Sequence, residues 1–414
     1  MIEVKSLRLP NGLLLLHHHD KSTQMVAVNI LYDVGARDEQ PMRTGMAHLF
    51  EHLMFGGTAN IPNFDTPLQK AGGESNAWTS SDLTNFYDIL PSQNIETAFW
   101  LESDRMSNMT FSRQSLDVQK GVVVEEFKQR CVNVPYGDLD HILRDTAFTT
   151  HPYKWPVIGR NFNDIENVTL DEVQDFFHNH YTPGNAILCV SGNITFEQAA
   201  QLTIKWFGNI AHGTTVKRNI PAEPAQQSPR RRQICRSDVP QNIIVKAFHM
   251  CGRNDDAFPV CDIISDLLAN GNSARFFKNV LLKTDLFSDL DAAVWGSIDP
   301  GLFVIKGKLA PGADTDKAET LINTEIKKLT DGDVSQYEID KFANKVESRE
   351  CFENISYAEK ASKLCYQQLV TGNAGDINHE IQKYRSITTE QVVSEAKKLF
   401  DTTNETTLLY GPDF

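Results

Sequence analysis

The sequence predicts an α+β protein made of two homologous α/β domains, each a mainly antiparallel sheet covered by helices. The chain has 414 residues, more than one typical domain contains. Its second half repeats segments of the first half, and each repeated segment passes from a capped helical pattern to a strand pattern. The expected division is a domain at 1–213, a linker at 214–232 and a second domain at 233–414.

The clearest repeat pairs residues 168–192 with residues 387–411 without a gap. Each copy predicts a helix that begins after a threonine N-cap, Thr169 or Thr388, and has acidic residues in its first turn. A turn and a strand then follow. The two copies therefore predict the same supersecondary unit in each domain.

The starts of the two halves match more weakly. Residues 25–38 resemble residues 242–255, and in both copies a β-rich run ends at a glycine. The segment 213–232 between the halves holds three prolines and the basic run Arg230–Arg232. This composition is typical of a linker, and we interpret the basic run as a solvated linker end rather than a binding patch.

The first half contains the sequence His48-Leu49-Phe50-Glu51-His52. Two histidines four residues apart on a helix lie on the same face, so both can bind one metal ion. Glu51 lies beside that face, where it can take a proton from a water molecule next to the metal. The order His-x-x-Glu-His is that of the inverzincin metallopeptidases. The motif therefore predicts a zinc peptidase with Glu51 as general base.

The internal repeat makes a purely structural role for this motif less attractive. The positions of the second half that align with His48, Glu51 and His52 are Ser265, Leu268 and Ala269. The duplicated fold thus predicts a helix at both places but needs the two histidines and the glutamate at only one. Chemistry is the better reason for those residues, and the second domain is expected to lack a metal site.

A catalytic zinc ion usually has three protein ligands, so a third ligand is expected elsewhere in the chain. The candidates are Glu125 and Glu126, in a segment at 115–130 that predicts a helix. Adjacent residues on a helix point about 100° apart, so only one of the two can reach the metal. Helical periodicity leaves the choice between them open.

Composition and charge exclude some other functions. The formal net charge of −14 argues against a nucleic-acid partner held through phosphates. No apolar run approaches the length of a membrane helix, and no signal-peptide core is present at the start. Seven cysteines without a C-x-x-C pair suit free thiols. We expect a cytoplasmic protein without a membrane partner, or a periplasmic or organellar one if a targeting segment has been removed.

Five segments of the first half carry a resemblance to a known family. They read GMAHLFEHLMFGGT at 45–58, AGGESNAWTSSDLTNFYDILP at 71–91, VVVEEFKQR at 122–130, HPYKWPVIG at 151–159 and HYTPGNAILCVSGN at 180–193. Through them the chain resembles the M16 metallopeptidases, the family of pitrilysin, insulin-degrading enzyme and the mitochondrial processing peptidase, and is most similar to its smaller two-domain members. The resemblance covers nearly the whole chain.

The resemblance implies one Zn²⁺ per chain with His48, His52 and Glu126 as ligands, because Glu126 occupies the register of the family's zinc glutamate. It places Gln119 where many members carry a glutamate that supports the metal ligands. Glutamine there removes a negative charge, which is expected to lower turnover relative to such members.

The resemblance also implies a substrate site. Related enzymes bind the peptide as an added strand along the segment that here contains Asn76, Ala77 and Trp78. They place an arginine and a tyrosine of the second half, or of a partner subunit, over the substrate. The matching positions here are Arg275 and Phe287, and phenylalanine cannot donate the hydroxyl hydrogen bond that stabilises an oxyanion.

Two interpretations of the chain's activity therefore remain open. It is either a self-sufficient zinc endopeptidase, weaker than its relatives, that cuts short or unfolded peptides in an enclosed chamber, or a subunit that needs a zinc-free partner carrying the Arg/Tyr pair. A peptide-binding protein without turnover and a structural subunit are further alternatives. The resemblance implies a homodimer, or a heterodimer with a zinc-free M16-like subunit.

Overall fold

The computed structural model describes residues 1–213 and 218–412, and its contacts divide the chain into two compact units. Unit 1 comprises Met1–Lys128, Trp155–Ile220 and Cys351–Asn378, and unit 2 comprises Gln129–Lys154, Pro221–Glu350 and His379–Phe414. The first residues of the expected linker, 214–217, lie outside the described residues. Within the described ranges no helix is both long and apolar enough to cross a membrane.

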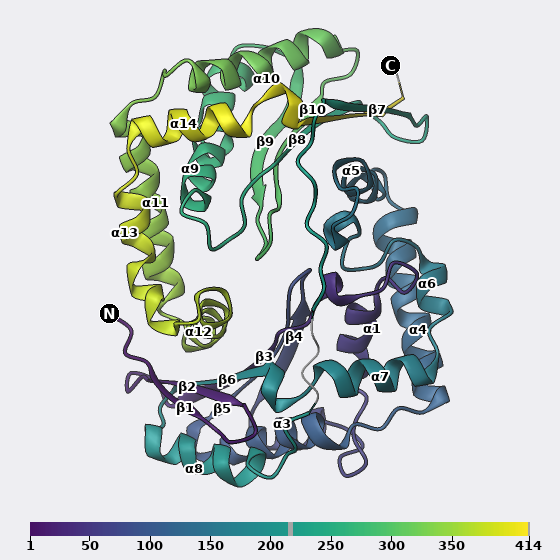
Figure 1. Cartoon of the computed structure of the whole chain (residues 1–414), viewed down its shortest axis with the longest axis vertical. Helices are drawn as coiled ribbons and strands as arrows, with labels where there is room; N and C mark the ends of the chain where they lie inside the picture. Colours follow the sequence, from purple (N-terminus) through teal and green to yellow (C-terminus); the bar gives the residue numbers. More distant parts are fainter. Residues whose placement is uncertain (214–217, 413–414) are drawn as a thin grey trace. The chain divides into compact units, whose positions relative to one another are not determined.

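Unit 1 is built on a six-stranded sheet with the order β1-β2-β6-β3-β5-β4. Only the β2–β6 pair is parallel. Helices cover both faces of the sheet (Figure 1). The strands are β1 (Lys5–Arg8), β2 (Leu14–His19), β3 (Met25–Tyr32), β4 (Glu74–Thr79), β5 (Thr84–Pro91) and β6 (Ala186–Gly192). The helices are α1 (Met46–Leu53), α2 (Asp65–Lys70), α3 (Glu96–Asn108), α4 (Arg113–Phe127), α6 (Phe162–Glu166), α7 (Leu170–His180), α8 (Phe196–Phe207) and α12 (Tyr357–Thr371).

Unit 2 is built on a five-stranded sheet with the order β7-β11-β8-β10-β9, in which only β7 and β11 are parallel. The strands are β7 (Arg230–Cys235), β8 (Ile243–His249), β9 (Phe287–Trp295), β10 (Leu302–Leu309) and β11 (Glu405–Gly411). The helices are α5 (Leu139–Ala147), α9 (Phe258–Ala269), α10 (Thr315–Thr330), α11 (Gln336–Glu353), α13 (Glu380–Arg385) and α14 (Thr389–Leu399). The last turn of α11 falls in unit 1. The expected fold class, two helix-covered and mainly antiparallel sheets, is confirmed.

The central strand β3 explains why each sheet needs helices on both faces. Val26 and Ile30 point into the core formed with α1, α3, α7 and α8. Ala27 and Leu31, which alternate with them, point into a second core formed with α12. A strand that is apolar on both sides must be covered on both sides. In unit 2 the corresponding covers are α9, α10, α11 and α14 on one face and α5 on the other.

The internal duplication is visible element by element. Thr169 and Thr388 are the N-caps of α7 and α14, and each forms a capping box with the third helical residue. The strands that follow, β6 and β11, occupy equivalent positions in the two sheets. Asn185 and Asn404 also make equivalent bonds, since each side-chain amide donates to a carbonyl near the end of its helix and to one at the end of the neighbouring strand.

The two units do not coincide with two contiguous stretches of sequence. The helix that covers one face of the sheet in unit 1, α12, comes from the second half, and its counterpart in unit 2, α5, comes from the first half. Contacts therefore divide the chain differently from the expected boundaries 1–213, 214–232 and 233–414. The basic run Arg230–Arg232, expected at the end of the linker, forms strand β7 and makes ion pairs with Glu319 and Asp145.

Glu223, a residue of the expected linker, holds a turn of unit 2 in place. Its carboxylate accepts hydrogen bonds from the backbone N–H groups of Thr149 at 2.7 Å, Thr150 at 2.9 Å and His151 at 2.9 Å. Burial by itself raises the pKa of this carboxyl group. The hydrogen bonds from His151, Thr149 and Thr150 outweigh burial and lower the pKa to about 2, from a usual value of 4.5.

We predict that this carboxylate makes the stability of the protein depend on acidity below neutral pH. Because the pKa of Glu223 is lower in the folded state than in the unfolded state, the carboxylate stabilises the fold at any pH above the unfolded pKa of 4.5. This stabilisation is lost as the pH falls towards the folded pKa of about 2. The variant Glu223→Gln is expected to melt at a lower temperature than wild type at pH 7, with the difference shrinking from pH 4.5 downwards. Thermal unfolding followed by circular dichroism across this range measures it. Glu197→Gln, at an exposed glutamate, is the control, and a difference that stays constant with pH contradicts the prediction.

Candidate metal centre

The helix that carries the His-x-x-Glu-His motif, α1, has an unusual N-terminus. Gly45 precedes it with φ +87°, and a Cβ atom at this position would meet the carbonyl oxygen of Ile158 at 2.9 Å. The side chain of Glu39 takes the place of an ordinary N-cap, because its two carboxyl oxygens accept the N–H groups of Gly45 at 2.9 Å and Ala47 at 2.8 Å. Burial raises the pKa of Glu39 well above its usual value in spite of these bonds.

The sequence of α1 gives the helix one buried side and one functional side. Met46, Ala47, Leu49, Phe50 and Leu53 are buried in the core of unit 1. The ring of Phe50 stacks on Tyr181 with 4.4 Å between centroids, which fixes the helix against the end of α7. The three polar residues of the motif are only partly buried. Packing on one side thus presents the two imidazoles and the carboxylate on the other.

Helix α4 brings a third side chain to this place. Ser112 caps the helix through a capping box, and Val123 and Phe127 anchor it in apolar contacts. The carboxylate of Glu126 lies against both imidazoles and is 19% exposed. The side chain of Glu125 is 62% exposed and pairs with Lys128 at 2.6 Å. The structure thus brings Glu126, and not Glu125, to the two histidines.

The geometry of the cluster fits a zinc ion. Oε2 of Glu126 lies 3.7 Å from Nε2 of His48 and 3.4 Å from Nε2 of His52. Ligand atoms at zinc–ligand distances of about 2.0–2.1 Å and tetrahedral angles are separated by about 3.3–3.4 Å. All three ligand atoms lie within 4.8 Å of one another. Two imidazoles and one carboxylate are also a ligand set that catalytic zinc uses, with a fourth position left open.

Glu51 does not join this cluster but is held beside it. Its Oε2 accepts a hydrogen bond from the hydroxyl of Thr79 at 2.5 Å. Thr79 is the last residue of β4, so the orientation of Glu51 depends on a strand that lies far from α1 in the sequence. The arrangement leaves the cluster of three ligands intact and keeps a separate carboxylate next to it.

The predicted substrate segment, Asn76, Ala77 and Trp78, lies on β4, which is one of the two edge strands of its sheet. A strand in the interior of the sheet could not have paired with a peptide, and β4 is not such a strand. Asn76 and Trp78 are exposed while Ala77 is half-buried, as expected for alternating residues at an edge. The N–H group of Ala77 donates to the side chain of Asn76 at 2.8 Å.

The remaining predicted residues lie further from the cluster or in the other unit. Gln119 is on α4, about two helical turns before Glu126 and therefore on the same side of the helix. Arg275 belongs to unit 2, where its guanidinium donates to the carboxylate of Glu338 at 3.1 Å. Phe287 begins β9 and is buried in the core of unit 2. The roles assigned to these three residues stay predictions.

Two residues that support the site were missed in the sequence. Glu39 carried no signal, because a cap that acts from outside its own helix leaves no local spacing pattern. Thr79 stood at the end of the predicted substrate segment, but nothing in the sequence indicated that its hydroxyl reaches Glu51. Helix α9, the counterpart of α1, carries Ser265, Leu268 and Ala269 as the alignment predicted. Within the described residues, His48, His52 and Glu126 are the one group of its kind close enough to hold a metal ion.

Comparisons with known proteins agree with this geometry. A family model described as "Insulinase (Peptidase family M16)" matches residues 14–159, which include all four residues of the candidate centre. A second model, described as "Peptidase M16 inactive domain", matches residues 167–346.

Among curated proteins, the zinc protease PqqE of Helicobacter pylori is 27% identical, over 99% of this chain and 93% of its own length. The probable mitochondrial-processing peptidase subunit beta of Arabidopsis thaliana is 25% identical, over 70% of this chain and 54% of its own. Among solved structures, a protease from Helicobacter pylori matches with a TM-score of 0.92 at 26% identity, covering 99% of this chain and 100% of that chain.

The two family models follow one another along the sequence and leave residues 1–13, 160–166 and 347–414 unmatched. The full-length relatives extend the same match to both ends. The chain therefore belongs to the M16 family of peptidases, in which several of its relatives are named zinc proteases.

Proposed function

We propose that the protein is a zinc-dependent endopeptidase that hydrolyses short or unfolded peptides. One observation carries the proposal. His48, His52 and Glu126 converge from two helices with the spacing of zinc ligands, while Glu51, on the same helix as the histidines, stays outside the cluster. A purely structural cluster would not need a fourth polar group held in place beside it by a separate strand.

The three converging side chains would hold one zinc ion per chain. When bound, zinc lowers the pKa of water and polarises a carbonyl group, which is the chemistry that hydrolysis of a peptide bond needs. Gln119 lies on the same side of α4 as Glu126, where it would support the ligand set without adding charge.

Glu51 is the general base of the proposed reaction. Its carboxylate takes the proton of the attacking water and later delivers it to the leaving amine. The hydroxyl of Thr79 donates a hydrogen bond to Oε2 of Glu51. This bond orients the carboxylate beside the ligand cluster. Thr79 acts here as a positioning residue.

The substrate would bind as an added strand on β4. An edge strand offers backbone groups to an extended peptide, and β4 is an edge whose last residue contacts the general base. A docking peptide would replace the bond between the N–H of Ala77 and the side chain of Asn76. The exposed indole of Trp78 would contact a side chain of the peptide.

The choice between the two adjacent glutamates gives a matched test of the metal site. Glu126→Gln is expected to weaken zinc binding at least tenfold, an order of magnitude typical of damage to a zinc site. Glu125→Gln is expected to keep the wild-type affinity, because its side chain is exposed and pairs with Lys128. Competition with a zinc chelator, with the folded state checked by circular dichroism, measures both. Loss of zinc by Glu125→Gln with retention by Glu126→Gln contradicts the assignment.

The role of Glu51 is tested separately from metal binding. Glu51→Gln should retain zinc and lose cleavage of a quenched fluorescent peptide library by a factor of roughly 10² or more. Thr79→Val should also retain zinc and lower kcat roughly tenfold, because the carboxylate is no longer held. Thr66→Val, at an exposed threonine of α2, is the control. Full activity of Glu51→Gln rules out the proposed base.

A second candidate function is a zinc-binding subunit that needs a partner for turnover. It is favoured by unit 2, where Arg275 is committed to an ion pair with Glu338 and position 287 carries a buried phenylalanine. If wild type binds zinc but cleaves no peptide of the library, this second function replaces the first. The missing groups would then come from a zinc-free M16-like subunit, as the family resemblance implied.

A further inference from the structure

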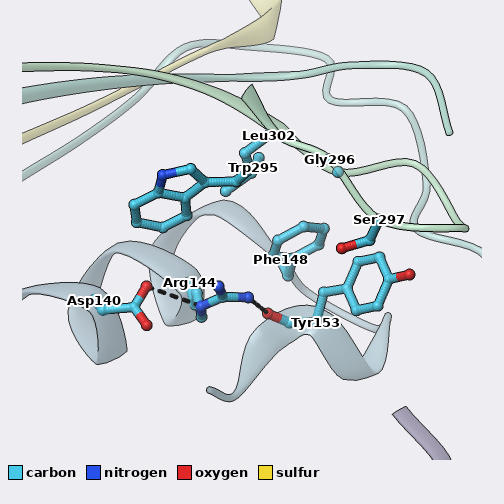
Figure 2. A pocket seen from close by; sticks show the side chains of 9 residues that line it. Asp140, Arg144, Phe148, Tyr153, Trp295, Gly296, Ser297 and Leu302 are labelled. Carbon is cyan, nitrogen blue, oxygen red and sulfur yellow. Dashed lines mark hydrogen bonds and ion pairs between the residues drawn. The ribbon is translucent and has the colours of Figure 1, made fainter. Parts of the chain in front are cut away.

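A cavity of about 440 Å³ lies within unit 2, between α5 and the end of β9. Figure 2 shows its walls, which are the indole of Trp295 and the rings of Phe148 and Tyr153, with Arg144 on the helix side. Ser297 and Gly296 border it from the turn between β9 and β10. The cavity thus combines aromatic surface with one guanidinium group.

The internal repeat explains why the cavity is open. In unit 1 the corresponding face of the sheet is covered by α12, which has 15 residues. In unit 2 the cover is α5, which has 9 residues and packs on β8, β11 and β7. The outer strands β9 and β10 are therefore less covered on this face. Trp295, at the end of the edge strand β9, forms one wall of the hollow that remains.

Arg144 is held in position but keeps donors available. Its Nε donates to Asp140 at 2.8 Å and its Nη1 donates to the backbone carbonyl of Tyr153 at 3.2 Å. Its guanidinium lies over the ring of Trp295, 5.2 Å from the centroid. A guanidinium carries five N–H donors, so these two bonds leave donors for a ligand. The side chain is 19% exposed, which makes an interaction with an anion there stronger than on an open surface.

The walls of the cavity are tied together before any ligand binds. The hydroxyl of Tyr153 accepts the N–H group of Asp299 at 3.0 Å, which joins the turn between β9 and β10 to the segment after α5. The ring of His151 lies 3.5 Å from the carboxylate of Asp299. The same residue, Tyr153, also accepts from Arg144 through its backbone carbonyl. A site that is already ordered loses less conformational entropy on binding.

The chemistry of these walls selects a class of ligand. The guanidinium suits a single carboxylate, because such pairs form charge-assisted hydrogen bonds. The neighbouring carboxylate of Asp140 disfavours ligands with more negative charge, such as phosphates. Phe148, Tyr153 and Trp295 suit a large apolar or aromatic group next to the ligand carboxylate. The C-terminal residue of a peptide that ends in such a side chain has both groups.

An adjoining cavity provides room for the rest of a peptide. It measures about 410 Å³ and shares Asp140 and Trp295 with the first. Its lining includes the apolar side chains of Val245, Ala293 and Val304, from three neighbouring strands. A chain that enters from this side can place one or two further residues over the sheet.

We propose that the cavity beside Arg144 binds the C-terminal residue of a peptide, with its α-carboxylate on the guanidinium and an aromatic or large aliphatic side chain against Trp295. The proposal rests on the proposed peptidase function, since hydrolysis of a peptide generates such carboxyl termini, but it concerns a site in unit 2, whereas His48, His52 and Glu126 belong to unit 1. No local pattern indicates this site, because its residues come from the α5 segment of the first half and from strands of the second half.

The test compares two peptides that differ in one group. The full-length protein carrying Glu51→Gln, with zinc, is titrated by calorimetry with acetyl-Ala-Ala-Phe as the free acid and as the C-terminal amide. The Glu51→Gln background prevents turnover, so binding is measured directly. The acid is expected to bind roughly tenfold to hundredfold more tightly than the amide, the range for one interaction between charged groups.

Variants decide where the carboxylate binds. When Arg144→Gln is added to the Glu51→Gln protein, the preference for the acid should disappear. When Trp295→Leu is added instead, the affinity for the acid and the affinity for the amide should fall by similar factors. Arg232→Gln removes another arginine of unit 2, which pairs with Asp145 outside the cavity, and should leave the preference intact. Circular dichroism spectra and melting temperatures verify the fold of each variant.

Each outcome has one meaning. Equal binding of the acid and the amide overturns the proposal. A preference for the acid that survives Arg144→Gln also overturns it, because the carboxylate then binds elsewhere, such as at the zinc ion. A preference that disappears only with Arg144→Gln supports it. The peptidase proposal is judged separately by cleavage with wild type. Cleavage without a preference for the acid contradicts this inference alone, and the preference without cleavage contradicts the peptidase proposal alone.

Discussion

The candidate site depends on how the short helix α1 is fixed in unit 1. A helix of this length is not stable by itself, so tertiary contacts must hold it. The buried carboxyl group of Glu39 satisfies its first N–H groups, and the stacking of Phe50 on Tyr181 fixes its apolar side. These contacts set the direction in which His48 and His52 point. The ligand geometry therefore depends on residues that never touch the metal.

The duplication separates what the fold needs from what the chemistry needs. Both units have a helix at the position of α1, a capped helix leading into the strand β6 or β11, and sheets with apolar residues on both faces. Unit 2 folds without the two histidines and the glutamate of the motif. A purely structural explanation of the motif would have to explain why the same helix is stable in unit 2 with Ser265, Leu268 and Ala269.

Each unit also includes one helix from the other half of the sequence, and this has consequences for both. In unit 1, α12 packs on β2, β3, β5 and β6, with Ala361, Leu364 and Cys365 in an apolar core. In unit 2 the shorter α5 leaves space that aromatic side chains and Arg144 surround. The same architecture thus places an apolar core under the longer helix α12 in one unit and a cavity beside the shorter helix α5 in the other.

The sequence by itself determined the duplicated α/β fold, the zinc-type motif on α1 and the presence of a glutamate pair on α4. These follow from spacing and periodicity, which are local properties. The periodicity of α4 did not choose between Glu125 and Glu126. The family register indicated Glu126, and the tertiary structure brings that side chain to the histidines. Only the tertiary structure decided that Thr79 holds Glu51, that Glu39 caps α1, and that α5 and Trp295 enclose a cavity. Each of these joins residues distant in the sequence, and such contacts are set by how the elements pack rather than by any local pattern.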